Sequence, residues 1–245
     1  MSKNSAITSQ DRSLLMLLIA TVITIIIWFL PFGRLILYPF TILGTWFHEM
    51  GHGLTSLMLG GHFDRLEIFS NGSGLAYTAI RGLLVNKELE SALVAAGGLI
   101  APPIFGTIFM VSGKNPKVAS ITLSIFSVAL LTSLAIWVRS SYGLGVIGAI
   151  AFVISLIAFK GSATVKQFSI QFLGVQAILN TYQQIDYLFT EKVEIDGKAM
   201  LSDTGSIASN LLLPYWFWGG AILFFSVLML LISYKIVYNE KNNNI

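Results

Sequence analysis

The chain has 245 residues, of which 55% are hydrophobic and 11% are charged, and its mean hydropathy is +0.76. That apolar share is beyond the range of a water-soluble domain, so a soluble fold is excluded and a membrane protein is predicted. The formal net charge is +3 without a basic cluster, so no nucleic-acid partner is expected, and the lack of cysteine excludes disulfides and Cys-based zinc sites.

Seven apolar stretches predict an all-α polytopic membrane protein with about six to seven transmembrane helices, because each is near the roughly 20 residues that a bilayer core requires. They are 13–30, 35–59, 92–112, 118–138, 142–159, 168–189 and 212–236. We expect the first to be a retained helix, because it is too long and too evenly apolar for a signal peptide. The whole chain, 1–245, is expected to form one integral membrane domain, with a polar loop at 190–210 and a polar tail at 239–245.

The second stretch contains 45-TWFHEMGHGLTSLMLGG-61, in which His48, Glu49 and His52 follow the pattern H-E-x-x-H. Residues four apart in an α-helix lie on one face, one turn apart, so the two imidazoles can hold one zinc ion. Glu49 projects from a different angle, near enough to reach a water on that metal without being a ligand. The pattern therefore predicts Zn²⁺ on the two histidines and Glu49 as the general base for attack on a carbonyl group.

The placement of this motif favours a metal site over a structural polar cluster. Two of the three histidines of the chain belong to it, and Glu49 is the one acidic residue well inside the first five apolar stretches. An ionisable group at membrane depth is costly, so it indicates a function.

Glycines and prolines gather in two of the predicted helices. They are Gly44, Gly51 and Gly53 around the H-E-x-x-H motif, and Gly97, Gly98, Pro102 and Pro103 in the stretch 92–112. The first group indicates either room for a metal and a substrate or close helix packing. The second indicates either close packing with a kink or an unwound wall beside a cavity.

The connection 61–82 alternates apolar and polar residues around Asn71-Gly72, which predicts a short β-hairpin-like segment after the H-E-x-x-H helix. His62 begins this connection. It lies ten residues past His52, about 15 Å along a continuing helix, so it cannot complete the same metal site and is expected at the loop surface.

Two segments together resemble the M50B-like branch of the site-2 protease group, which consists of membrane-embedded zinc metalloproteases. They are 38-YPFTILGTWFHEMGHGLTSLMLGGHFDRLEIFSNGSGLAYT-78 and 94-VAAGGLIAPPIFG-106. The shared features are the Tyr-Pro entry, His-Glu-x-Gly-His, the Gly-Gly that ends the helix, the strand-like segment that closes on Ser-Gly, and the next helix with Gly-Gly and Pro-Pro. The resemblance implies the fold of the group, its zinc chemistry and a third zinc ligand, an Asp from a later segment.

Two positions are similar to the group's patterns for that third ligand. Asp203, in 202-SDTGSIA-208, resembles the Ser-Asp-small-x-x-x-Ala pattern of the M50B-like branch, and its alternative role is a helix N-cap. Asp186, in 180-NTYQQIDYLF-189, resembles an Asn-then-Asp arrangement in which Asn180 would help to position substrate. We expect Asp203 to be the ligand, with Asp186 as the alternative. The chain lacks the Asp-Gly next to Asn-Pro of better-known members.

The resemblance implies an intramembrane zinc metalloprotease that hydrolyses peptide bonds of membrane-embedded substrates, with membrane-protein segments and the lipid bilayer as partners. The substrate would unwind, and Asn180 and the strand-like 66-LEIFS-70 would pair with it. The alternatives are a non-catalytic membrane scaffold that retains the protease fold and a transporter whose intramembrane His and Glu carry ions. The intact motif favours the enzyme, because a scaffold does not need Glu49.

Overall fold

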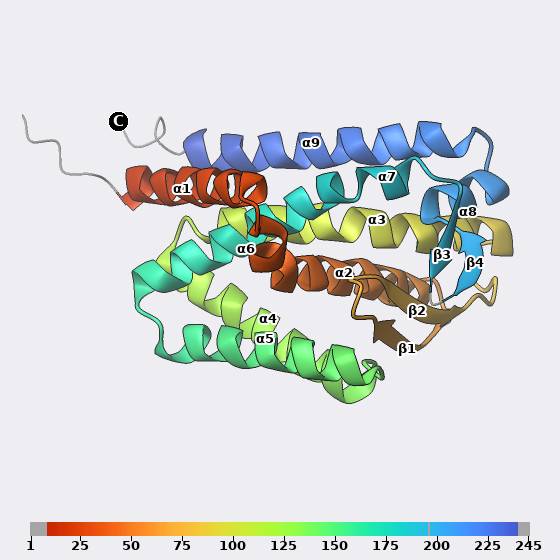
Figure 1. The fold of residues 1–245 in the computed structure, drawn as a ribbon, viewed down its shortest axis with the longest axis horizontal. Helices are drawn as coiled ribbons and strands as arrows, with labels where there is room; N and C mark the ends of the chain where they lie inside the picture. The colour runs from red at the N-terminus through yellow and green to blue at the C-terminus, as the bar shows by residue number, and fades with distance from the viewer. Residues whose placement is uncertain (1–8, 196, 240–245) are drawn as a thin grey trace, which may run out of the picture.

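The structure is a computed structural model that describes residues 9–195 and 197–239, most of which are helical (Figure 1). The long helices are α1 (Ser9–Phe29), α2 (Gly33–Met58), α3 (Lys87–Ser112), α4 (Pro116–Ile136), α5 (Ser141–Lys160), α6 (Ala163–Gln183) and α9 (Tyr215–Asn239). The shorter elements are β1 (His62–Ile68), β2 (Gly74–Ala79), α7 (Ile185–Leu188), β3 (Lys192–Ile195), β4 (Lys198–Leu201) and α8 (Asp203–Asn210). The long helices coincide with the seven predicted apolar stretches. Apart from Asn239, the predicted polar tail lies outside the described residues.

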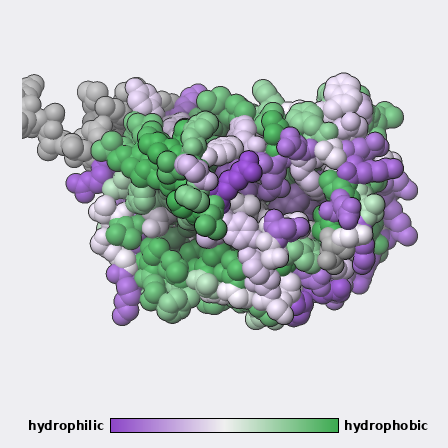
Figure 2. Space-filling view, in the orientation of Figure 1, coloured by the Kyte–Doolittle hydropathy of each residue, from purple (hydrophilic) through white to green (hydrophobic). Residues whose placement is uncertain are grey.

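Within the described part of the chain, five helices are long and apolar enough to cross a membrane, namely α1, α3, α4, α5 and α9. The remaining long helices, α2 and α6, are of similar length but carry the H-E-x-x-H residues and several glutamines. Hydrophobic residues cover much of the helical surface, and hydrophilic residues gather at the right-hand end, where the hairpins lie (Figures 1 and 2). The protein is therefore a multi-pass, all-α integral membrane protein, as predicted.

Helix α3 runs through the middle of the bundle and packs against α2, α6, α8 and α9, while α4 and α5 pair with each other on one side (Figure 1). Glycines allow the closest of these approaches. A Cβ at Gly51 of α2 would lie 2.5 Å from the carbonyl oxygen of Gly97 in α3. Because α3 continues without a break through Pro102 and Pro103, this segment is packed helix and does not form an unwound wall.

Side-chain caps fix where several helices begin. Asn86 caps α3 by accepting a hydrogen bond from the backbone N–H three residues later at 2.8 Å. Asn115 caps α4 in front of Pro116. Proline lacks a backbone N–H, but at the first helical position this costs nothing, because an N–H there has no acceptor within the helix. Ser202 caps α8, with its Oγ accepting from the Gly205 N–H at 3.0 Å. The cap therefore places Asp203 as the first residue of α8 and leaves its carboxylate free of the capping role.

The predicted hairpin after the H-E-x-x-H helix is formed by β1 and β2, which pair antiparallel. Its turn contains Gly72 at φ +91°, a backbone conformation that favours glycine. The Asn71 side chain accepts from the Ser73 N–H at 3.0 Å and so supports the turn. His62 is exposed at the start of β1, so it belongs to a strand and not to a loop.

The outer edge of β1 is already paired, so the expectation that residues 66–70 bind an extended substrate is wrong. Leu66 donates its N–H to the Trp137 carbonyl at 2.9 Å and accepts from the Arg139 N–H at 3.1 Å. The next outward-facing residue, Ile68, exchanges two hydrogen bonds of 2.9 Å with the Ser140 hydroxyl. Along the described chain, no backbone segment pairs with the outer edge of β2, which is therefore the open edge of this sheet.

The expected polar loop at 190–210 is a second hairpin followed by a short helix. Strands β3 and β4 pair antiparallel, and Gly197 has φ +71° in the turn between them. Backbone pairing continues to the base of the hairpin, where Ser202 donates its N–H to the Glu191 carbonyl at 2.9 Å. This hairpin connects α7 to α8 and sets where α8 meets the rest of the bundle.

Candidate metal centre

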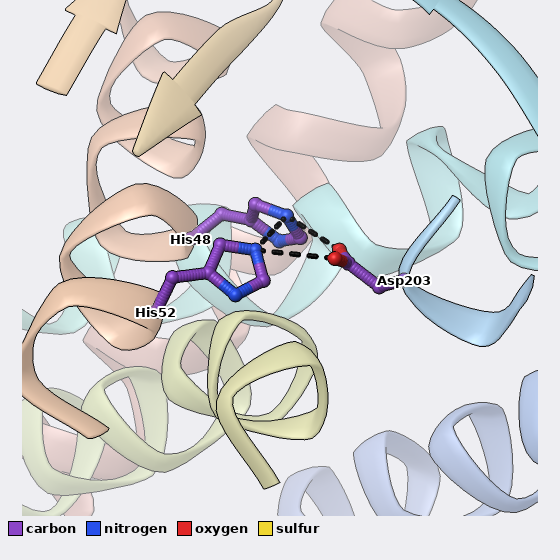
Figure 3. Close-up of side chains that lie close together, drawn as sticks. All are labelled: His48, His52 and Asp203. Carbon is purple, nitrogen blue, oxygen red and sulfur yellow. Dashed lines mark hydrogen bonds and ion pairs between the residues drawn. The ribbon is translucent and has the colours of Figure 1, made fainter. Parts of the chain in front are cut away.

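Both histidines of the motif project from α2 toward the same point (Figure 3). His48 and His52 lie one helical turn apart, and their ring centroids are 4.6 Å apart with nearly perpendicular planes. Their Nε2 atoms approach to 3.0 Å. The i, i+4 spacing thus brings two imidazole nitrogens together, as predicted from the sequence.

Asp203 reaches this point from the start of α8 (Figure 3). Its Oδ2 lies 2.9 Å from His48 Nε2, and its Oδ1 lies 3.4 Å from His52 Nε2. In the described parts of the chain, these three residues are the one group of three or more His, Asp or Glu side chains whose donor atoms all lie within 4.8 Å of one another. Asp186 is exposed on α7 and is not part of this group.

A backbone carbonyl of α3 fixes the orientation of the His52 ring. His52 Nδ1 lies 2.7 Å from the backbone carbonyl of Val94, and a carbonyl oxygen only accepts. Nδ1 therefore carries a proton, and Nε2 is the nitrogen that faces His48 and Asp203 and would bind a metal ion once it is deprotonated. A backbone carbonyl behind the ring of a histidine is the usual outer support of a metal-binding imidazole.

The donor atoms fit a zinc ion in both chemistry and spacing. Two imidazole nitrogens and one carboxylate are zinc ligands, and three protein ligands with one open position are typical of hydrolytic zinc. Zinc bonds of about 2.0–2.1 Å in a tetrahedron separate neighbouring ligand atoms by roughly 3.3 Å. The two Nε2 atoms are 3.0 Å apart, and each lies near a different oxygen of Asp203, at 2.9 Å for His48 and 3.4 Å for His52, so all three separations are close to that value.

Glu49 is buried, and its carboxylate lies beside β2 and outside the group formed by His48, His52 and Asp203. A Cβ at Gly74 would lie 2.8 Å from Glu49 Oε1, and the carboxylate also interacts with the backbone N–H of Ala76. It lines the same cavity as the two histidines and Asp203. This placement suits a proton acceptor next to the donor atoms.

The family model for Peptidase M50B-like proteins matches residues 17–233, which include the motif, both hairpins and Asp203. The chain belongs to the Peptidase M50B-like family. No curated protein and no solved structure matches it. Membership gives this M50B-like protein the fold of a peptidase family, as the sequence resemblance predicted.

The M50B-like site opens into a cavity of about 250 Å³ between the two hairpins. Ala76 and Thr78 of β2, Ile195 and Met200 of the β3–β4 hairpin, and Val94 of α3 are among the residues that line it. Of the two strands in this sheet, β2 is the one whose outer edge is not paired with another backbone segment of the described chain. An extended chain in this cavity would lie beside His48, Glu49, His52 and Asp203.

Asn180, predicted to position substrate, is buried in α6 and lies on the other side of His48. It packs against Gly44, where any side chain would collide with its amide. Its Oδ1 has no hydrogen-bond partner among the described residues. Gly44, Gly51 and Gly53 all contact neighbouring elements, so close packing accounts for these three glycines.

Asp203 is partly buried and is held by a residue that was not selected from the sequence. Burial by itself raises the pKa of a carboxyl group, but the two histidines outweigh it and hold the pKa of Asp203 below its usual value. Tyr187 donates its hydroxyl to Asp203 Oδ2 at 3.0 Å. Burial and the charge of Asp203 raise the pKa of Tyr187 well above its usual value, so the hydroxyl keeps its proton.

Gly98 is a second contributor to the site whose role was not assigned from the sequence. A Cβ at this position of α3 would collide with the ring of His52, including Nε2. The close approach lets α3 present the Val94 carbonyl to the other side of the same ring. The doublet Gly97-Gly98 was the available signal, but it is equally typical of helix packing.

Proposed function

We propose that this M50B-like protein is an intramembrane zinc metalloprotease that hydrolyses peptide bonds in membrane-embedded segments. The observation that carries the proposal is the convergence of His48, His52 and Asp203 within zinc-ligand spacing, with Glu49 in the same cavity. A zinc ion bound there would supply Lewis acidity, which polarises a carbonyl group and acidifies water.

Glu49 has the role of general base in this proposal. Its carboxylate accepts a proton from the attacking water as the water oxygen bonds to the carbonyl carbon, and then gives that proton to the nitrogen as the C–N bond breaks. The Ala76 N–H and the burial of the side chain keep the carboxylate at the cavity wall. The Val94 carbonyl keeps His52 in the tautomer that the site requires.

The substrate in this proposal is an unwound membrane segment. Its exposed backbone groups need partners, because lipid offers none. Residues of β2 line the cavity, and apart from the Ala76 N–H, which interacts with Glu49, the unpaired edge of this strand can supply them by strand addition, a role that β1 cannot have. The unpaired Oδ1 of Asn180 is a further acceptor beside His48.

The experiment measures zinc per chain and cleavage of a tagged single-span reporter protein by the purified full chain in liposomes. We expect about one zinc per chain and cleavage in the wild type, and loss of both in His48→Ala. The matched control is His62→Ala, because this histidine is exposed on β1 and outside the cluster. It should keep both zinc and activity.

The competing function is the non-catalytic scaffold that retains the protease fold. A wild-type protein with no stoichiometric zinc and no cleavage, but with stable capture of the uncleaved reporter, would contradict the protease and support the scaffold. Zinc without cleavage of any reporter, together with unchanged capture in His48→Ala, would support the same conclusion.

A further inference from the structure

Tyr187 touches the candidate metal centre from α7, a helix of one turn between α6 and the β3–β4 hairpin. Its hydroxyl donates to Asp203 Oδ2 at 3.0 Å and accepts from the Asp203 backbone N–H at 3.2 Å. Its ring meets the ring of His48 edge to face, with centroids 6.1 Å apart. One side chain thus contacts two of the three candidate ligands.

The two hydrogen bonds of this hydroxyl act on the same residue. One holds the carboxylate, the other holds the main chain that carries it, and together they restrict both the position and the rotation of the Asp203 side chain. Apart from the two histidines, no other side chain in the described residues is seen to bond this carboxylate. Without the hydroxyl, the carboxylate has only its metal-site partners to orient it.

We propose that Tyr187 is a positioning residue that presets the Asp203 carboxylate for metal binding. This inference rests on the proposed function, because it assigns a role toward the zinc ion. Outer partners of metal ligands typically contribute about 10- to 100-fold to metal affinity. The hydroxyl reaches the metal only through Asp203, so its effect depends on that residue being present.

The first test compares Tyr187→Phe with Tyr182→Phe in the purified full chain. The first variant removes the hydroxyl and keeps the ring against His48, whereas Tyr182 packs against a separate hydrophobic cluster of α1, α3, α6 and α9. Zinc affinity is measured by competition with a chromophoric chelator, and Co²⁺ absorption reports the ligand geometry. We expect Tyr187→Phe to bind zinc about 10- to 100-fold more weakly with an altered Co²⁺ spectrum, and Tyr182→Phe to match the wild type.

The second test repeats the Tyr187→Phe change in an Asp203→Ala background, where the weaker zinc binding of the two remaining imidazoles is measured against a low-affinity chelator. A positioning role through Asp203 predicts no further loss of affinity there, since the group being positioned is gone. A loss of the same factor in both backgrounds would show a general structural effect and overturn the inference. Thermal unfolding of the metal-free proteins shows whether either variant is destabilised before metal is added.

The outcomes separate this inference from the proposed function. Wild-type protein that binds no zinc, or binds it equally after His48→Ala, defeats the proposed function and the inference with it. Wild-type protein that binds zinc through His48, with an unchanged affinity in Tyr187→Phe, overturns the inference alone and leaves the protease proposal standing.

Discussion

The two parts of the candidate metal centre are constructed in different ways. His48, Glu49 and His52 lie within little more than one turn of a single helix, and the helical repeat places the two imidazoles one turn apart on one face, with their Nε2 atoms 3.0 Å apart. Asp203 arrives from the far end of the chain, on an eight-residue helix that follows a hairpin. The first part is thus fixed by secondary structure and the second by tertiary packing.

The difference shows where the site is adjustable. Any stable α2 presents the histidine pair, but the third donor depends on hydrogen bonds around α7 and the base of the β3–β4 hairpin. The Ser202 hydroxyl donates to the Thr190 carbonyl at 2.5 Å, the Ser202 N–H to the Glu191 carbonyl at 2.9 Å, and the Tyr187 hydroxyl to Asp203. Substitutions around α7 and the β3–β4 hairpin should therefore change the placement of Asp203, whereas they should leave the histidine pair in position.

The largest effect is expected on cleavage by Glu49→Gln, which changes the helical part without removing a ligand. The neutral amide cannot accept the proton of the attacking water, so the rate should fall by about 10²- to 10⁴-fold. Zinc content should remain that of the wild type, because Glu49 lies outside the donor cluster. Reporter cleavage and metal analysis on the same preparation check both expectations. Undiminished proteolysis would contradict the role of Glu49 as general base.

Removal of the third donor should have the next largest effect. We expect Asp203→Ala to lose stoichiometric zinc, because only two of the three donor side chains, the imidazoles of His48 and His52, would remain. Asp186→Ala is the matched control, since it removes an exposed carboxylate from the neighbouring α7. Equilibrium dialysis against a zinc buffer measures both. The reverse pattern would transfer the ligand role to Asp186, and retention of zinc in both would show that neither carboxylate holds the metal.

The sequence predicted the helical part well, because its signals are local. Seven apolar stretches became the seven long helices, and Asn71-Gly72 became the turn of the β1–β2 hairpin. The H-E-x-x-H spacing predicted the histidine pair for the same reason, since it is a property of one helix. The resemblance to the M50B-like family then added the expectation for Asp203, which spacing alone could not provide.

The packing part was predicted less well, because its signals depend on partners that are distant in sequence. Asp196-Gly197 between short alternating segments is a hairpin signal, but the polar composition around it favoured a loop. The prediction of 66–70 as a substrate-binding strand was wrong because Leu66 pairs with the 137–139 segment, and nothing in the sequence near Leu66 indicates that pairing. Tyr187 was overlooked beside the acidic Asp186, since a single phenol in an apolar segment is typical of packing.

A smaller effect is expected at the contact between the two parts, where α3 supports His52. Gly98→Ala places a methyl group against the His52 ring, so the ring must rotate away from Val94 and the cluster. We expect zinc affinity to fall about tenfold, in the range of a lost outer partner. Gly148→Ala is the control, because a Cβ there meets nothing within 4 Å. Equal zinc affinity in both variants would show that the His52 ring tolerates the displacement.

The smallest effect is expected from Ser202→Ala, which tests whether the start of α8 sets the position of the third donor. The change removes the cap on the Gly205 N–H and the bond to Thr190, and an N-cap contributes about 1 kcal/mol. If that energy acts on the placement of Asp203, zinc affinity falls by about fivefold, since 1.4 kcal/mol corresponds to tenfold.

Ser162→Ala is the matched control for this last change, because Ser162 caps α6 by accepting from the Val165 N–H at 3.4 Å, in a part of the chain that contributes nothing to the donor cluster. Both variants should unfold at slightly lower temperature, but only Ser202→Ala should bind zinc more weakly in the chelator competition. Such a result locates the adjustable part of the metal centre at the hairpin and α8. Equal zinc affinity in the two variants would instead mean that Asp203 is held from the Tyr187 side, and that the cap stabilises α8 without positioning its first carboxylate.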